Sequence, residues 1–183
     1  MGGLFWPDLL FATPGPEFLD AVLEAEPALV QELDAVAWHP YRYPFTAPEL
    51  SDDYQPSLIE ESCALQEQLA AHGASELDVW ITELGWHTAP DALYEGASDE
   101  DQAAWLVRSA VLAWAQGSSM YLWYTFRDSG TSDSDQEARF GLYDSEGEPK
   151  AAAVAFGVLS SALAEANTGH IEDRSQLLGL GED

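Results

Sequence analysis

The stretch VWITELGW at residues 79–86 places an acidic residue, Glu83, at the end of a run of apolar and β-branched residues. The run from residue 77 to residue 83 predicts a buried β-strand, because such side chains pack well on a sheet that is covered on its faces. A carboxylate is expensive to bury without partners. Glu83 therefore either leaves the strand to reach solvent or the next loop, or is held at the strand end for a chemical task.

Short apolar runs alternate with longer helical segments along the rest of the chain. Further strands are expected at residues 9–12, 34–39 and 120–126, and helices at residues 17–33, 57–72, 98–117 and 149–164. Pro27 should kink or split the first helix, since proline lacks the backbone N–H. Ser57 with Glu60, and Ser98 with Asp101, have the spacing of helix caps. Successive strand–helix units predict a parallel sheet with right-handed crossovers.

The long loops follow strands rather than helices, at residues 40–56, 84–97 and 127–148. In a (β/α)8 barrel (TIM barrel), the loops after the strands carry the active site. An open doubly wound sheet also binds ligands at that edge, but it usually has a glycine-rich phosphate loop, which this sequence lacks. A complete barrel has eight units and about 250 residues. We therefore expect an α/β protein that forms half of a TIM barrel over residues 1–165, followed by an acidic tail at residues 166–183.

The charge balance restricts the possible partners. The chain contains 6 Lys and Arg against 33 Asp and Glu, a net charge of −27. Such a surface repels the phosphates of nucleic acids and of anionic membranes, so neither is an expected partner. Self-repulsion also destabilises a compact chain unless salt screens it. We interpret the surface as an adaptation to high salt; the alternative is an ordinary acidic protein from a low-salt source.

No part of the sequence points to a disulfide, a metal, a cofactor or a membrane span. Cys63 stands alone in a helical pattern and is expected to be a small core residue. The histidines lack the spacing of metal ligands; they are His39, His72, His87 and His170. No apolar run approaches the ~18 residues of a spanning helix, and the sequence does not open on a basic leader. We expect a soluble protein, with secretion of a longer form left open.

Polar and aromatic residues recur at the same end of the expected strands. His39 and Tyr41 follow one strand, Trp86 follows Glu83, and a Trp-Tyr pair at residues 123–124 belongs to the last strand. Aromatic faces stack on the C–H faces of sugar rings, while His and Tyr bond hydroxyls or hold a carboxylate in place. A single aromatic residue is more often part of a core. Their repeated placement at one end of consecutive strands favours a carbohydrate site.

These residues lie in motifs that resemble a known group of enzymes. HPY at residues 39–41 resembles the sixth-strand motif of clan A glycoside hydrolases, and WITELGW at residues 80–86 resembles their seventh strand. The remaining matches are SDEDQAA at residues 98–104, YLWY at 121–124, FGLYD at 140–144, Gly147 and PK at 149–150. The likeness is to bacterial and archaeal proteins akin to family 39 and to cellulase-like family 5 proteins. It covers about residues 9–163.

The resemblance implies a role for each of five residues. Glu83 corresponds to the nucleophile that ends the seventh strand, and Tyr41 to a hydrogen-bond partner of that carboxylate. His39 is expected to contact the sugar or to support a residue that does. Trp123, in the motif of the eighth strand, is expected to stack on the sugar beside the cleaved bond. Trp86 is a weaker candidate for substrate contact.

One departure from the motif set affects the expected activity. The resemblance implies a retaining mechanism, whose acid/base carboxylate ends the fourth strand in an Asn-Glu pair. This sequence contains no such pair, and its only asparagine is Asn167. Since the matched strands are the fifth to the eighth, the chain is expected to be the C-terminal half of a truncated or split glycoside hydrolase, inactive without a missing N-terminal half. The alternatives are a half-barrel that binds carbohydrate without cleaving it, and a homodimer whose two copies close a barrel.

Overall fold

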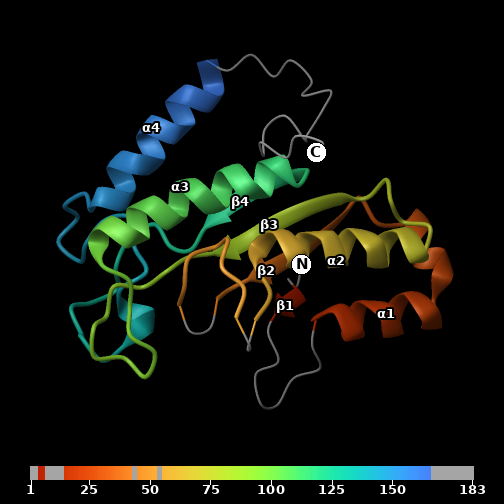
Figure 1. Cartoon of the computed structure of the whole chain (residues 1–183), viewed down its shortest axis with the longest axis horizontal. Helices are drawn as coiled ribbons and strands as arrows, with labels where there is room; N and C mark the ends of the chain where they lie inside the picture. Colours follow the sequence, from red (N-terminus) through yellow and green to blue (C-terminus); the bar gives the residue numbers. More distant parts are fainter. Residues whose placement is uncertain (1–3, 7–14, 43–44, 53–54, 166–183) are drawn as a thin grey trace, which may run out of the picture.

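The computed structural model describes residues 4–6, 15–42, 45–52 and 55–165. Its strands are β1 (Leu4–Trp6), β2 (Ala35–Pro40), β3 (Asp78–Leu84) and β4 (Ser118–Trp123). Its α-helices are α1 (Gly15–Ala25), α2 (Leu58–Ala71), α3 (Asp99–Ala115) and α4 (Ala151–Glu165). Two short 3-10 helices are η1 (Pro27–Gln31) and η2 (Gln136–Ala138). Strands and helices therefore alternate along the chain, as expected from the sequence (Figure 1).

The four strands form one parallel sheet in the order β1-β2-β3-β4. Val36 of β2 lies beside Val79 of β3, and Trp38 lies beside Ile81. Each strand pairs with the next one along the chain, and a helix lies in each connection. The prediction of an α/β fold with parallel strands and alternating helices is confirmed, and the strand order is that of consecutive βα units in a barrel.

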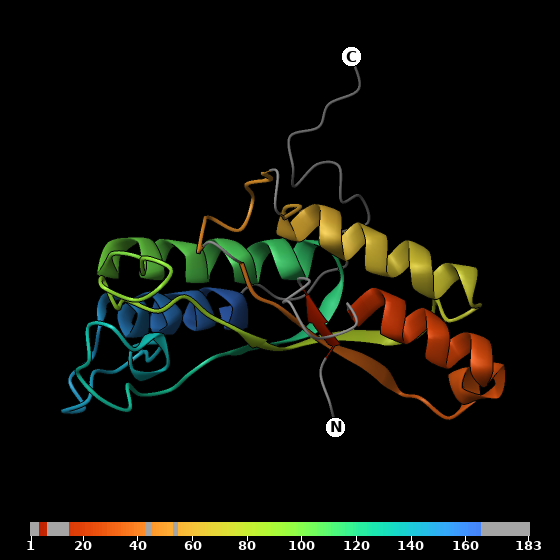
Figure 2. The same ribbon diagram turned by 90° about the horizontal axis from the view of Figure 1, so that it is seen from below.

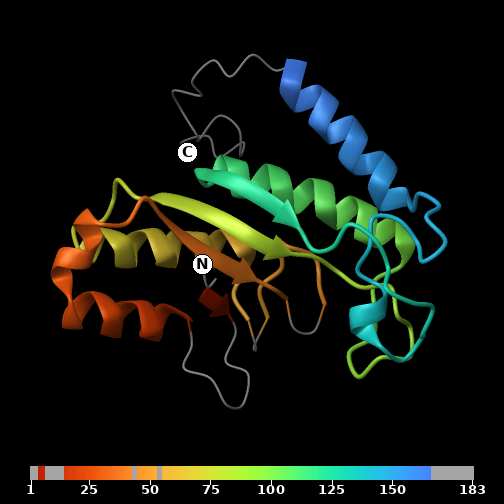
Figure 3. The same cartoon turned by 180° about the vertical axis from the view of Figure 1, so that it is seen from behind.

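The described helices cover one face of the sheet, and no described helix covers the other face (Figure 3). Trp38 and Ile81 belong to a core that includes residues of α1, α2 and α3. Tyr121 of β4 also faces α3, so its neighbours Met120 and Leu122 face the opposite side. Their side chains are 37% and 48% exposed. Seen from behind, the strands lie in front of the helices, and no described helix lies over them (Figure 3).

The helices are grouped at the two ends of the sheet. Figure 2 shows α1 beside α2 at one end, and α3 beside α4 at the other. The second group has an apolar cluster of its own, formed by Leu106 of α3, Ala152 of α4 and Leu142 of the preceding loop. None of the described helices combines the length and the apolar character needed to cross a membrane.

Several local predictions are confirmed. Ser57 and Glu60 form a capping box at the start of α2, and the side chain of Ser98 accepts a hydrogen bond from the Asp101 backbone at the start of α3. α1 ends before Pro27, where η1 begins. The expected strand at residues 9–12 and the acidic tail at 166–183 lie outside the described residues; the strand that the structure describes before α1 is β1.

Two local expectations are corrected. β4 ends at Trp123 rather than at residue 126, because the chain leaves the ladder there and enters the loop before α4. Cys63 is exposed and does not belong to the core. It lies in α2 between the buried residues Ser62 and Leu65, on the part of the helix that turns away from the sheet. The prediction that Cys63 lies in a helix was correct, but the prediction that it faces the core was wrong.

Candidate active site

Glu83 lies at the carboxyl end of β3, where a local irregularity turns its side chain. In regular alternation Glu83 would share the face of Val79 and Ile81, which are buried toward the helices. The register with β4 shifts between Ile81 and Leu84, so Leu84 takes the buried face instead. Such an irregularity re-aims side chains, and it is common next to active sites. The Glu83 side chain is consequently 43% exposed.

Tyr41 is the residue that holds the Glu83 carboxylate. It follows the end of β2, the strand beside β3, and its hydroxyl donates a hydrogen bond of 3.3 Å to Oε2 of Glu83. The carboxyl ends of neighbouring parallel strands meet at one edge of a sheet, which is why residues 42 positions apart come together. The expected contact between Tyr41 and Glu83 is therefore present.

His39 completes this group from the end of β2. Its Nδ1 lies 3.6 Å from Oε2 of Glu83, and its Nε2 lies 2.9 Å from Oγ1 of Thr82. Burial lowers the pKa of His39, and the negative charge of Glu83 acts in the opposite direction. A neutral imidazole has one donor nitrogen and one acceptor nitrogen, so His39 can hold Thr82 while its other nitrogen faces the carboxylate.

A buried polar cluster fixes the backbone of Tyr41. The side-chain amide of Gln55 donates to the carbonyl of Tyr41 at 2.8 Å and to Oε1 of Glu61 at 2.7 Å. Arg42 approaches Glu61 to 3.9 Å, and both side chains are almost fully buried. Burial raises the pKa of Glu61 to about 7, against the opposing effects of Gln55 and Arg42. The cluster ties the loop after β2 to α2, so the position of Tyr41 depends on α2.

The two expected tryptophans pack against each other. Trp86 is fully buried, donates its indole N–H to the carbonyl of Thr46 at 2.9 Å, and packs against Trp105 of α3. Trp123 stacks on Trp86 with ring centroids 6.0 Å apart and is half-buried. It packs against the apolar clusters on the helix side of the sheet. Trp86 therefore offers no surface to a sugar in this structure.

Tyr124 belongs to the aromatic pair that the sequence analysis noted at the end of the last strand, but it was given no role of its own there. Its ring meets the ring of Tyr41 edge to face, with centroids 6.2 Å apart, and its hydroxyl donates to Oε2 of Glu137 at 3.2 Å. A side chain at Gly85 would collide with the carbonyl of Tyr124, so the glycine allows the two chains to approach. Trp123 is the last residue of β4 and packs toward the helices, whereas Tyr124 lies just beyond the strand and meets Tyr41.

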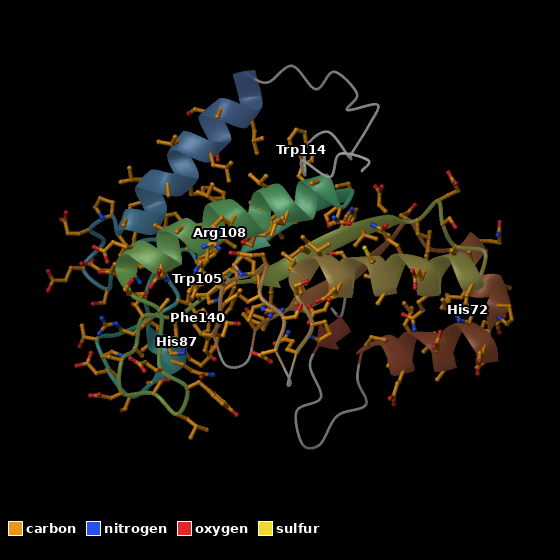
Figure 4. The ribbon with its side chains drawn as sticks, viewed as in Figure 1. His72, His87, Trp105, Arg108, Trp114 and Phe140 are labelled. Atoms are coloured by element: carbon orange, nitrogen blue, oxygen red, sulfur yellow. The ribbon has the colours of Figure 1, made fainter. Side chains whose placement is uncertain are left out.

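Phe140 forms the apolar wall behind Tyr41 and Tyr124. Its ring centroid lies 6.1 Å from that of Tyr41 and 5.4 Å from that of Tyr124. On its other side lies His87, which is fully buried between Phe140 and Phe45. Burial lowers the pKa of His87 to about 4, so this histidine is neutral near pH 7. Figure 4 shows His87 and Phe140 close together below the start of α3.

The arrangement has the chemistry of a nucleophile at an open edge. A carboxylate can attack a carbon that carries a leaving group, provided that a donor fixes its orientation. Glu83 has such a donor in Tyr41, and its own side chain is partly accessible. His72 does not belong to the site: it lies at the far end of α2 and bonds Asp20 of α1 at 2.8 Å (Figure 4).

Comparison with solved structures gives the wider context. A family 39 glycoside hydrolase from Bacteroides cellulosilyticus is similar, with a TM-score of 0.62, 28% identity, and 80% of this chain covered against 30% of that one. A glucosidase from Croceicoccus marinus gives a TM-score of 0.60 at 16% identity, covering 88% of this chain and 31% of that one. A GH5_18 protein from Bifidobacterium longum, solved with Manβ1-4GlcNAc, gives 0.51 at 20% identity, covering 75% and 33%.

The last two likenesses, at lower identity, establish the fold alone. No protein-family model and no curated protein matches the sequence. The chain spans about 30% of the length of the solved structures first described, and its strands and helices match part of their barrels. The chain is therefore similar to clan A glycoside hydrolases, including proteins of families 39 and 5, and forms part of the (β/α) barrel on which they are built.

Proposed function

We propose that this chain supplies the nucleophile part of a retaining glycoside hydrolase site, and that Glu83 attacks the anomeric carbon. The observation that carries the proposal is the hydrogen bond of 3.3 Å from Tyr41 to the Glu83 carboxylate, at the carboxyl end of β3. Retaining enzymes use such a carboxylate to form a covalent glycosyl-enzyme. Tyr41 orients the nucleophile, and the neutral His39 supports it from the neighbouring strand end.

The aromatic residues supply the platform for the sugar. Tyr124 contacts the ring of Tyr41, which bonds Glu83, and the charge of Glu83 contributes to the raised pKa of Tyr124, so the Tyr124 ring is the part of the platform that we assign beside Glu83. Trp123 is half-buried and packs against the apolar clusters on the helix side of the sheet, so it supports the platform from that side rather than forming its surface. Trp86 lies against Trp123 and supports it from the core without touching the sugar.

In this proposal, the acid/base carboxylate comes from a polypeptide segment other than this chain. The sequence has no Asn-Glu pair, and loss of a general acid slows leaving-group departure by roughly 10²–10⁴-fold. The open face of the sheet, with Met120 and Leu122 exposed, supports a missing partner, because parallel sheets are normally covered on both faces. A second copy is the less favoured partner, since each copy carries a net charge of −27.

Activated glycosides test the nucleophilic role of Glu83 independently of the missing general acid. The dinitrophenolate group of a 2,4-dinitrophenyl β-glycoside departs without protonation. The isolated chain is therefore expected to form the ester between Glu83 and the anomeric carbon as the bond to dinitrophenolate breaks. Azide then attacks the anomeric carbon, breaks that ester, and yields a β-glycosyl azide and the free carboxylate. We expect azide to accelerate turnover, and glycosides with poor leaving groups to stay intact.

Glu83→Gln is expected to abolish both dinitrophenolate release and azide product. The matched control is Glu76→Gln, which removes the same charge before the opposite end of β3, at an exposed position. Turnover that survives Glu83→Gln removes Glu83 from the mechanism. Rapid hydrolysis of unactivated glycosides by the chain alone refutes the missing acid.

Carbohydrate binding without cleavage is the second candidate, and the absence of an Asn-Glu pair favours it. It predicts that the folded chain binds oligosaccharides but releases no dinitrophenolate with or without azide. A folded chain that binds no sugar contradicts both candidates. Sedimentation tests the homodimer directly: a barrel closed by two copies predicts a dimer, and a folded monomer excludes it.

A further inference from the structure

Glu137 is a second carboxylate that the structure brings toward Glu83. It lies in η2, on the loop between β4 and α4, and its Oε2 accepts a hydrogen bond of 3.2 Å from the hydroxyl of Tyr124. Tyr124 in turn meets Tyr41, which bonds Glu83. Burial, followed by the charges of Glu137 and Glu83, raises the pKa of Tyr124. The carboxylates of Glu83 and Glu137 therefore both lie close enough to Tyr124 to raise the pKa of its hydroxyl.

The loop that presents Glu137 is anchored on both sides. Before it, Oδ1 of Asp135 accepts a hydrogen bond of 3.0 Å from the backbone N–H of Glu137. After it, the carbonyl of Arg139 accepts bonds from the backbone of Thr88 at 3.0 Å and from the Lys150 ammonium at 3.4 Å. The Glu137 side chain itself is exposed, so a fixed backbone offers an accessible carboxylate.

No lysine or arginine side chain among the described residues contacts Glu83, Tyr124 or Glu137, and burial lowers the pKa of His39, the histidine beside Glu83. Each described lysine or arginine is committed elsewhere: Arg42 to Glu61, Arg108 to Glu49, Arg127 to the carbonyl of Ser145, Arg139 to Asp133, and Lys150 to Asp128. Arginine and lysine are the side chains that bind carboxylate, phosphate and sulfate groups. In the described part of the chain, an anionic ligand beside Tyr124 therefore meets the carboxylates of Glu83 and Glu137 and no lysine or arginine.

We propose that Glu137, held by Tyr124, is a specificity-determining residue that restricts the site to uncharged sugars. This inference rests on the proposed function and names its substrate class. A carboxylate accepts hydrogen bonds from neighbouring hydroxyls of a neutral sugar, whereas it repels the carboxylate of a uronic acid. Uronides and sulfated or phosphorylated sugars are excluded for the same reason.

Paired ligands that differ in one group test the proposal. The full chain is titrated with methyl β-glucopyranoside and with the corresponding glucuronide, and then with the matching galactose pair, followed by NMR. Molar salt screens the long-range charge of the protein, so the comparison reports close contacts. We expect the neutral glycoside to bind at least about tenfold more tightly than the uronide, since like charges in contact are strongly unfavourable.

Two variants locate the effect. Glu137→Gln is expected to narrow the preference for the neutral sugar, while Glu67→Gln, which removes the same charge from an exposed position of α2, leaves it unchanged. Circular dichroism verifies that both variants fold. If the unmodified chain binds the uronide as tightly as the neutral glycoside or more tightly, the inference about Glu137 is overturned and the proposed function is not. The same holds if Glu137→Gln leaves the preference for the neutral sugar unchanged. Binding of no glycoside in either series overturns the proposed function, and the inference with it.

Discussion

The hydroxyl of Tyr41 and the carboxylate of Glu83 meet at 3.3 Å across the ends of two neighbouring strands. Neither residue reaches this contact by regular strand geometry. Tyr41 lies beyond β2, where Gln55 holds its carbonyl, and Glu83 is turned outward by the register shift in β3. The contact therefore depends on two departures from the ladder that occur at the same edge of the sheet.

Tyr41→Phe removes the donor and keeps the ring. We expect dinitrophenolate release from an activated glycoside to fall about 10- to 100-fold, because a hydrogen bond to a charged group is worth about 1.5–3 kcal/mol. The matched control is Tyr143→Phe, a tyrosine of the loop before α4 that packs against Phe126. An unchanged rate in Tyr41→Phe shows that the contact does not orient the nucleophile.

Trp86→Ala tests whether this residue belongs to the core rather than to the sugar surface. Its side chain is fully buried, so we expect the free energy of unfolding to fall by about 3–5 kcal/mol. Trp114→Ala, at a position 40% exposed near the end of α3 (Figure 4), should change it by less than about 1 kcal/mol. Urea titrations in molar salt measure both. Similar losses for the two variants contradict the assignment.

Local rules in the sequence predicted most of the fold. Proline at position 27 cannot continue the interior of α1 and begins η1, and the serine caps at Ser57 and Ser98 act within four residues. The alternation of strands and helices then predicted the parallel sheet. It also predicted that His39 and Glu83 would lie at one edge, because parallel strands share a direction.

The orientation of site residues could not be predicted in the same way. Strand alternation buries Glu83 with Ile81, and only the pairing with β4 introduces the shift that exposes it. Likewise, the sequence alone does not decide which residue of the Trp123-Tyr124 pair faces the site. Glu137 was missed because its contact with Tyr124 spans a loop without a motif. These features arise from tertiary pairing rather than from local pattern.

The buried carboxyl of Glu61 predicts a pH dependence of stability. Its pKa is raised from 4.5 to about 7, chiefly by burial. The folded chain therefore binds the proton more tightly than the unfolded chain, and this contribution is full below 4.5 and lost as the pH rises through about 7. The loss is at most roughly 3 kcal/mol.

Glu61→Gln removes this contribution while retaining the size of the side chain. We expect the stability of the variant, relative to the unmodified chain, to increase between about pH 5 and about pH 8. Urea titrations at both pH values give the difference. Glu67→Gln, at an exposed position of the same helix, should show no such trend. Parallel pH profiles for Glu61→Gln and the unmodified chain contradict the prediction.

The excess of negative charge predicts that salt stabilises the fold. With a net charge of −27, the carboxylates repel one another most strongly when the chain is compact. The screening length falls from about 30 Å at 0.01 M salt to about 3 Å at 1 M, so the melting temperature should rise across this range. The same melts near the isoelectric point of about 4.1 serve as the control, since the net charge vanishes there. Equal melting temperatures at low and molar salt near neutral pH contradict the adaptation to high salt. If salt raises the melting temperature equally near neutral pH and near the isoelectric point, charge screening is not the cause of the rise.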